Sequence, residues 1–209
     1  MIKIWGRNTS SNVQKAMWAV GELKLEHTRI DVGGAFGKTK EPAYLAMNPN
    51  ALVPTLEEDD GFTLWESNSI IRYLAGKHDK SGVLEPKDAH QRALASQWMD
   101  WQLSVLGPAI TPAFWGLIRT PPEKRDAAAI KTSQEKTVTA MLMLEGQLAK
   151  TPFVAGPSFS YGDIPVGVMC YRYRQLVPDR PKTPNLDRWY DAIAKRKPFQ
   201  DNVGSIPLS

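Results

Sequence analysis

The chain has 209 residues, of which 42% are hydrophobic and 23% charged, and this ordinary globular composition excludes disordered, collagen-like and coiled-coil proteins. The net charge is +4, but the 26 Lys and Arg residues are interspersed with 22 Asp and Glu residues, so no nucleic-acid partner is expected. No apolar run reaches the roughly 18 residues of a membrane span, so no membrane partner is expected either. The single cysteine, Cys170, allows no internal disulfide, and no leader pattern precedes the first predicted strand; we therefore expect a cytoplasmic protein.

The first third of the chain alternates between strand and helix patterns. Short apolar strands are predicted at residues 2–5, 27–32, 53–57 and 62–65, and helical spacing at 13–23, 42–45 and 67–74. Ser67 or Asn68 is the expected cap of the last of these helices. The order βαβαββα predicts an α/β domain over residues 1–76.

Residues 88–209 carry helical patterns only, beyond a polar, turn-rich linker at 77–87. One apolar stripe has the 4-3-4 spacing of a helix face and consists of Leu94, Trp98, Trp101 and Val105. Pro108 and Pro112 are expected to bend or end that helix. Further helices are predicted at 130–148, after Ser160 and around 186–193. The fold class is therefore α/β plus all-α.

Capping-type residues crowd the turn after the first strand: Asn8, Thr9, Ser10, Ser11 and Asn12. Helix capping explains some of them. Five exceed what one helix needs, and a hydroxyl at a helix N-terminus can also bind a phosphate, a carboxylate or a thiolate. Both interpretations stay open at this point.

Two other dipeptides allow a functional interpretation. Val53-Pro54 opens a strand, either as an ordinary trans edge proline or as a cis proline that exposes the Val53 main chain to a peptide-like ligand. Glu66-Ser67 opens a helix, either as a cap or as an amino-acid head-group site. In the second case Glu66 would hold an ammonium and Ser67 a carboxylate.

Other candidates favour folding over chemistry. Ser160 and Asp163 have the spacing of a capping box, flanked by Phe159 and Ile164 at the hydrophobic-staple positions. The three histidines, His27, His78 and His90, share no metal or triad spacing, so no metal is expected. Cys170 lies in an apolar helical stretch and is expected to serve packing.

In this order and spacing, Val53-Pro54, Glu66-Ser67 and Ser160-Tyr161-Gly162-Asp163 resemble the motifs of the cytosolic glutathione S-transferase family over essentially the whole chain. The resemblance implies a thioredoxin-like, glutathione-binding domain at 1–76 and an all-helical domain at 88–209. It also implies a cis proline at Pro54. The residue 6–15 turn has no strand-1 tyrosine and is most similar to bacterial theta-like and nu-like members.

What the resemblance implies for function is a glutathione transferase in detoxification, with glutathione as co-substrate. Ser10 and Asn12 would activate the thiol for attack on a small hydrophobic electrophile. The implied glutathione-binding residues are Thr9, Ser11, Val53, Pro54, Glu66, Ser67 and Asp100, the last reaching the ligand of a neighbouring subunit in a homodimer. Trp115 and Arg119 would line an electrophile pocket between the domains. The alternatives are a glutathione-dependent disulfide reductase or peroxidase, and a non-enzymatic binding protein.

Overall fold

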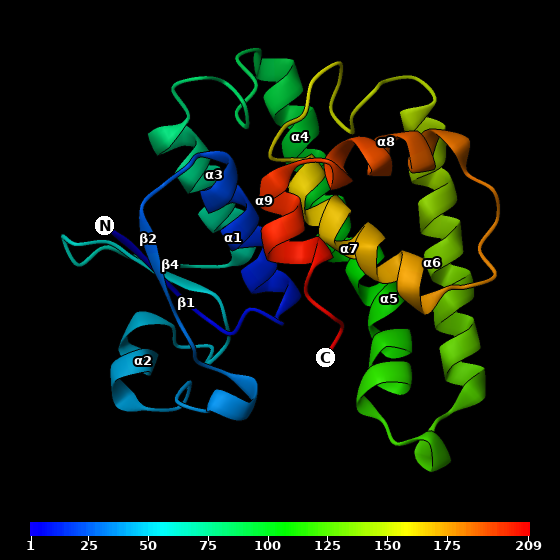
Figure 1. The fold of residues 1–209 in the computed structure, drawn as a ribbon, viewed down its shortest axis with the longest axis horizontal. Coiled ribbons are helices and arrows are strands. Elements are labelled where there is room, and N and C mark those ends of the chain that lie inside the picture. The colour runs from blue at the N-terminus through cyan, green and yellow to red at the C-terminus, as the bar shows by residue number, and fades with distance from the viewer. The chain divides into compact units, whose positions relative to one another are not determined.

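The structure is a computed structural model that describes residues 1–209 (Figure 1). The chain forms two compact units. The first unit comprises Met1–Glu85 together with Pro198–Ile206, and the second comprises Pro86–Lys197 together with Pro207–Ser209. None of the helices combines the length and the apolar character that crossing a membrane requires.

The first unit contains a mixed four-stranded sheet with the strand order β2-β1-β3-β4. Its elements are β1 (Ile2–Trp5), α1 (Ser11–Glu22), β2 (His27–Ile30), a 3-10 turn (Gly34–Phe36), α2 (Pro42–Met47), β3 (Thr55–Glu57), β4 (Thr63–Trp65) and α3 (Ser67–His78). β2 runs parallel to β1, whereas β3 is antiparallel to both β1 and β4. The predicted βαβαββα order and the thioredoxin-like fold are confirmed.

The core of the first unit forms where the two apolar periodicities meet. Ile2 and Ile4 alternate along β1 and face the helices, and the apolar stripe of α1 covers them with Val13 and Val20. In Figure 1, α3 lies beside α1, and it adds the fully buried Leu74 to this core. Each such buried aliphatic side chain stabilises the fold by roughly 1.5–3 kcal/mol.

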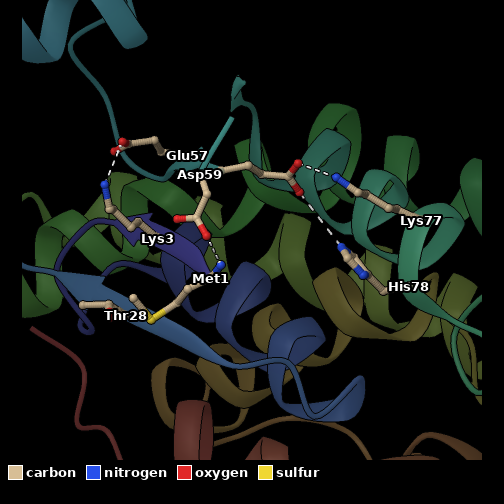
Figure 2. A network of polar contacts seen from close by, with 8 residues as sticks. Met1, Lys3, Thr28, Glu57, Asp59, Lys77 and His78 are labelled. Atoms are coloured by element: carbon tan, nitrogen blue, oxygen red, sulfur yellow. Dashed lines mark hydrogen bonds and ion pairs between the residues drawn. The ribbon is translucent and has the colours of Figure 1, made fainter. Parts of the chain in front are cut away.

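A polar network surrounds the start of β1 and the end of β3 (Figure 2). Figure 2 shows Lys3 directed toward Glu57, whose nearest oxygen lies 2.8 Å from the lysine nitrogen. The buried Glu58 carboxylate accepts hydrogen bonds from Lys77 and, at 2.9 Å, from the Tyr73 hydroxyl. These contacts raise the pKa of Lys77 and fasten the β3–β4 hairpin to α3.

Residues 198–206 belong to the first unit although they follow the last long helix. The ring of Phe199 packs edge-on against Trp18 of α1, with centroids 4.9 Å apart. Gly21 leaves room for this segment, because a Cβ placed there would lie 2.9 Å from Cβ of Pro198. The C-terminal segment therefore completes the outer side of α1.

The second unit is helical, as predicted. Its elements are α4 (Ala89–Trp101), a π turn (Gln102–Leu106), α5 (Gly107–Phe114), a second π turn (Trp115–Arg119), a 3-10 turn (Pro122–Lys124), α6 (Ala127–Leu148), α7 (Asp163–Leu176) and α8 (Pro184–Ala194). The chain then continues through α9 (Lys197–Phe199) and a last π turn (Gln200–Gly204), which form most of the C-terminal segment of the first unit. Pro108 stands in the first turn of α5, where a missing N–H costs little.

The expectation that Pro112 bends or ends a helix is wrong for the end of α5, which continues to Phe114. Ser133 of α6 supplies the physical reason. Its hydroxyl accepts a hydrogen bond from the N–H of Ala113 and donates one to the carbonyl of Ala109. A neighbouring side chain thus occupies the main-chain groups around the proline.

The start of α7 departs in detail from the predicted capping box. The helix begins at Asp163, and the N–H of Ser160 donates to its carboxylate at 2.9 Å, which is one half of the box. In the other half the Ser160 hydroxyl accepts from Gly162 instead of Asp163. Asp163 is fully buried, and this burial raises its pKa to about 6 although four donors point at its oxygens.

Candidate functional site

A small pocket of about 40 Å³ lies in the first unit. Its walls come from the start of α1, the loop before β3, the end of β4 and the start of α3. The lining residues are Asn12, Asn48, Asn50, Leu52, Val53, Pro54, Trp65, Glu66 and Ser67. The pocket brings together Asn12 and both dipeptides that the sequence analysis selected, Val53-Pro54 and Glu66-Ser67.

Ser10 precedes α1 in the cap position, next to pocket residue Asn12. Its backbone is extended, but its hydroxyl makes no capping hydrogen bond to the helix. The first turn of α1 also contains no acidic residue. Helix capping therefore does not account for the Ser10 hydroxyl, and the positive end of the helix dipole is not neutralised from within the helix.

Thr9, Ser10 and Ser11 lie outside the lining of the pocket. The turn that carries them closes through a 3.2 Å hydrogen bond from the N–H of Ser10 to the carbonyl of Arg7. All three side chains are partly exposed. The start of α1 thus presents three accessible hydroxyls beside Asn12.

The starts of α1 and α3 meet inside this pocket. The hydroxyl of Ser67 donates to Oδ1 of Asn12 over 3.5 Å, a long contact that joins the two helix N-termini. Ser67 is nearly fully buried, whereas Glu66 and Asn12 are exposed. A polar ligand in the pocket would therefore meet the N–H groups of α3 on the same side as the Glu66 carboxylate.

Glu66 has a left-handed backbone with φ +72°, which costs free energy for a residue with a side chain. Strain of this kind concentrates at ligand sites. The prediction that Ser67 or Asn68 caps α3 is wrong. Glu66 occupies the cap position, its side chain makes no capping bond, and Ser67 is already helical.

Two buried side chains hold the loop before Val53 through hydrogen bonds. The hydroxyl of Tyr44 donates to the carbonyl of Leu52 at 2.6 Å, and Nδ2 of Asn48 donates to the same carbonyl at 2.9 Å. Burial raises the pKa of Tyr44. The Val53–Pro54 peptide bond, next in the chain, is cis.

Asn48, Asn50, Leu52 and Trp65 line the pocket but were not among the predicted site residues. In the sequence, Asn48-Pro49-Asn50 is typical only of a turn that ends a helix. Asn48 also holds the loop, because its Oδ1 accepts hydrogen bonds from the N–H and the side chain of Asn50. A turn signal next to a strand-opening proline was the available clue.

The remaining predicted site residues belong to the second unit. Asp100 is exposed near the end of α4, and its main-chain carbonyl accepts a hydrogen bond from Ser104. Trp115 is 58% exposed, and the guanidinium of Arg119 lies 6.0 Å from its ring centre and 5.7 Å from that of Phe114. Arg119 also donates to the main-chain oxygen of Ser209. These contacts form an aromatic and cationic surface cluster.

The other reactive groups are placed elsewhere. Cys170 is fully buried, and this burial raises its pKa to about 12, so the thiol is not ionised at neutral pH. No three His, Cys, Asp or Glu side chains are arranged so that they could hold a metal ion. The chemistry of the pocket therefore has to come from hydroxyls, amides, main-chain groups and Glu66.

Family models and relatives match the sequences of both units. The model "Glutathione S-transferase, N-terminal domain" matches residues 9–77, and "Glutathione S-transferase, C-terminal domain" matches residues 127–192. Glutathione S-transferase GstB of Escherichia coli (strain K12) is 40% identical over 210 residues, covering 100% of both chains. Glutathione S-transferase D6 of Drosophila melanogaster is 28% identical, covering 97% of this chain and 92% of the relative.

A solved structure is also close. The theta class glutathione S-transferase of the citrus canker pathogen Xanthomonas axonopodis pv. citri, with glutathione bound, superposes with a TM-score of 0.94. The two sequences are 40% identical, and the match covers 100% of this chain and 99% of the other.

Proposed function

The chain belongs to the glutathione S-transferase family, and from this premise we propose how its own residues activate glutathione. It is a glutathione transferase, with glutathione as the co-substrate. In the proposal the pocket of the first unit holds the tripeptide, and the start of α1 ionises its thiol. The unused hydroxyl of Ser10 is the observation that carries the proposal.

The energetic requirement is modest. A free thiol has a pKa near 8.5, and lowering it by about two units takes roughly 2.7 kcal/mol of preference for the anion. A charge-assisted hydrogen bond from Ser10 or Asn12 supplies about 1.5–3 kcal/mol. The dipole of α1 adds about 0.3–1 kcal/mol. No protein general base is needed, and the thiol proton leaves to solvent.

The rest of the pocket orients the tripeptide. The main chain of Val53, beside Pro54, would pair with the cysteinyl backbone as a neighbouring strand does. Glu66 would hold the ammonium of the γ-glutamyl group, and Ser67 with the first N–H groups of α3 its carboxylate. Thr9 and Ser11 would add contacts at the mouth of the turn. The thiolate sulfur then bonds to the electrophilic carbon, and the leaving group departs with its electron pair.

Ser10→Ala tests the thiolate assignment. We expect the pKa of the bound thiol to rise by about one to two units, because one charge-assisted hydrogen bond is lost. Ultraviolet absorbance of the thiolate, titrated with glutathione bound, measures this directly. Thr9→Ala and Ser11→Ala each remove one hydroxyl from the same turn and should shift the pKa less. An unchanged titration in Ser10→Ala would refute the assignment.

A glutathione-dependent disulfide reductase or peroxidase is the second candidate, favoured by the Ser10-x-Asn12 turn. Because Cys170 is buried and not ionised, only bound glutathione thiols could carry such a reaction. Rates with 1-chloro-2,4-dinitrobenzene and with 2-hydroxyethyl disulfide distinguish the two activities. We expect the first rate to dominate. The binding-only alternative would leave both rates at background.

The electrophile is proposed to be a small hydrophobic molecule that meets Trp115 and Arg119. The half-exposed indole offers a flat apolar surface, and Arg119 stacks against it. Trp115→Ala should raise KM for the electrophile several-fold and leave KM for glutathione unchanged. Equal changes in both constants would remove Trp115 from this role.

A homodimer is proposed from the apolar side chains that α4 and the following π turn leave in solvent. Leu94, Leu103 and Val105 are 40%, 44% and 42% exposed. Burying these side chains against a second copy would be favourable, and Asp100 on the same helix could then reach the partner's ligand. Analytical ultracentrifugation of the wild type and of Leu103→Glu tests this.

The unpaired Cys170 suits a cytoplasmic location.

A further inference from the structure

The peptide unit between Gly6 and Arg7 is held by the strand next to it. The N–H of Gly6 donates to the carbonyl of Ile30 at 2.8 Å, and the N–H of Arg7 donates to that of Val32 at 3.0 Å. This peptide unit lies directly before the turn that carries Ser10. Its orientation therefore decides where the turn begins.

Arg29 of β2 completes the fixation from the side. Its Nη1 donates to the carbonyl oxygen of Gly6 at 2.9 Å, and the same guanidinium pairs with the carboxylate of Asp31. The Arg29 side chain is only 25% exposed, so these contacts are partly shielded from water. The planar guanidinium can donate to two partners at once, which an ammonium cannot do with the same geometry.

The side chain of Val53 packs against Gly6 and Gly33. A Cβ placed on Gly6 would lie 3.2 Å from Cβ of Val53 and 2.4 Å from Cγ2 of Val13. A Cβ placed on Gly33 would lie 3.2 Å from Cγ1 of Val53. Both glycines also have positive φ, +153° and +79°, which glycine adopts without strain. The Val53 side chain therefore packs into a space that a larger residue at Gly6 or Gly33 would fill.

We propose that Arg29 is a positioning residue for the reaction: by holding the Gly6 carbonyl, it sets the place of the Ser10 hydroxyl relative to the main chain of Val53. The proposal rests on the function proposed above, in which these two groups bind the sulfur and the backbone of glutathione. The link to Ser10 is short, because the carbonyl of Arg7 accepts the hydrogen bond that closes the turn. A rotation of the Gly6–Arg7 peptide unit would move that carbonyl and Ser10 with it.

An ion pair between Arg29 and Asp31 that served stability alone would have no such effect. A partly exposed pair of this kind contributes modestly to stability, and removing it would leave the chemistry unchanged. The two interpretations differ in what they predict for the sulfur. A misplaced hydroxyl weakens its hydrogen bond to the thiolate, and misplacements of about 1 Å can cost up to 100-fold in rate.

The experiment compares Arg29→Met, which keeps the aliphatic stem but has no donor, with Arg29→Lys and Arg29→Gln. For Arg29→Met we expect the pKa of the bound thiol to rise by about half a unit to one unit, and kcat/KM at pH 6.5 to fall about tenfold. The Kd of glutathione should change less than threefold. Arg29→Lys should recover part of the loss, because an ammonium can still donate to the Gly6 carbonyl.

Lys3→Met is the matched control, since it removes another ion pair of the sheet, with Glu57, which does not touch the turn. It should leave the thiol pKa unchanged. Should Arg29→Met fail to fold by circular dichroism, Arg29→Gln, whose amide is uncharged and too short to reach both partners, replaces it with the same expected direction and a smaller rise in the pKa. A shift in melting temperature with the wild-type thiol pKa in these variants would overturn the proposal.

Ser10→Ala, titrated in parallel, separates the two levels of the argument. If Ser10→Ala raises the thiol pKa and the Arg29 variants do not, only the role of Arg29 fails. If Ser10→Ala leaves the pKa unchanged, the proposed function of Ser10 fails first, and the positioning role fails with it.

Discussion

At the start of α1, Ser10 holds the cap position with its hydroxyl unused and no acid in the following turn. At the start of α7, the Asp163 carboxylate accepts hydrogen bonds from the N–H groups of Val154 and Ser160 and from the indole of Trp189. Both helix ends offer unpaired N–H groups and a positive dipole. In α7 the protein itself supplies the anion, whereas in α1 that place is left for a ligand.

The largest effect should come from Asp163→Ala. The substitution leaves four buried donors without this acceptor, and each such loss costs about 1–3 kcal/mol. We expect the free energy of unfolding to fall by roughly 3–5 kcal/mol in urea titrations. Ser10→Ala, which loses no capping bond, should change it by less than about 0.5 kcal/mol. Similar losses in both variants would contradict the comparison.

The pH dependence of stability sharpens the same contrast. Burial raises the pKa of Asp163 from 3.8 to about 6, so between these two values the folded state holds a proton that the unfolded state has lost. The contribution of this group to stability therefore decreases as the pH rises from about 4 to about 6, by roughly 3 kcal/mol.

Asp163→Asn cannot titrate at this position and serves as the reference. The difference in free energy of unfolding between the wild type and this variant should decrease over the same pH range and stay constant above it. A difference that does not change with pH would show that the four hydrogen bonds cancel the effect of burial on this pKa, and a difference that increases with pH would show that they outweigh it.

An acid placed in the first turn of α1 would make it resemble α7. Ser11→Asp should stabilise the protein by about 0.3–1 kcal/mol through the helix dipole. The same carboxylate should raise the pKa of the bound thiol by up to about one unit, because two like charges would share one site. Ser11→Asn, which has the same shape without the charge, is the control. Thermal melts and thiolate absorbance report the two effects separately.

The smallest expected effect on glutathione is that of Tyr44→Phe, which loosens the loop before Val53. Removing the hydroxyl leaves the Leu52 carbonyl with Asn48 as its remaining partner and should cost about 1 kcal/mol. KM for glutathione should rise about threefold, since the Val53 main chain is less well placed. Tyr73→Phe removes a hydroxyl bonded to Glu58, away from the pocket, and should leave this KM unchanged.

Local patterns were sufficient for much of the fold. The apolar alternation of Ile2 and Ile4 and the helical spacing of Val13 and Val20 identify elements whose buried faces the structure confirms. The expectation that Pro112 ends a helix was wrong, because the main-chain groups around Pro112 bond to Ser133, which lies 21 positions later in the chain. A rule about one residue cannot include a partner from another helix.

Only part of the candidate site could be predicted from such local patterns. Asn12, Val53, Pro54, Glu66 and Ser67 stand at element boundaries, where cap and strand-opening residues are visible in the sequence. Asn50, Leu52 and Trp65 are loop or strand-end residues with no such signature. Trp65 lines the pocket because the register of β3 against β4 places it opposite Thr55, beside the loop that carries Asn50 and Leu52.

From its residue order alone, this protein's element sequence, its two apolar patterns and its family could be established, since each depends on periodicities and short motifs within a few residues. Tertiary structure alone decided that the Ser10 hydroxyl is unused, that Arg29 reaches the Gly6 carbonyl, and that residues 198–206 return to α1. These features depend on hydrogen bonds and contacts between distant segments, whose partners are chosen only when the sheet and helices have packed.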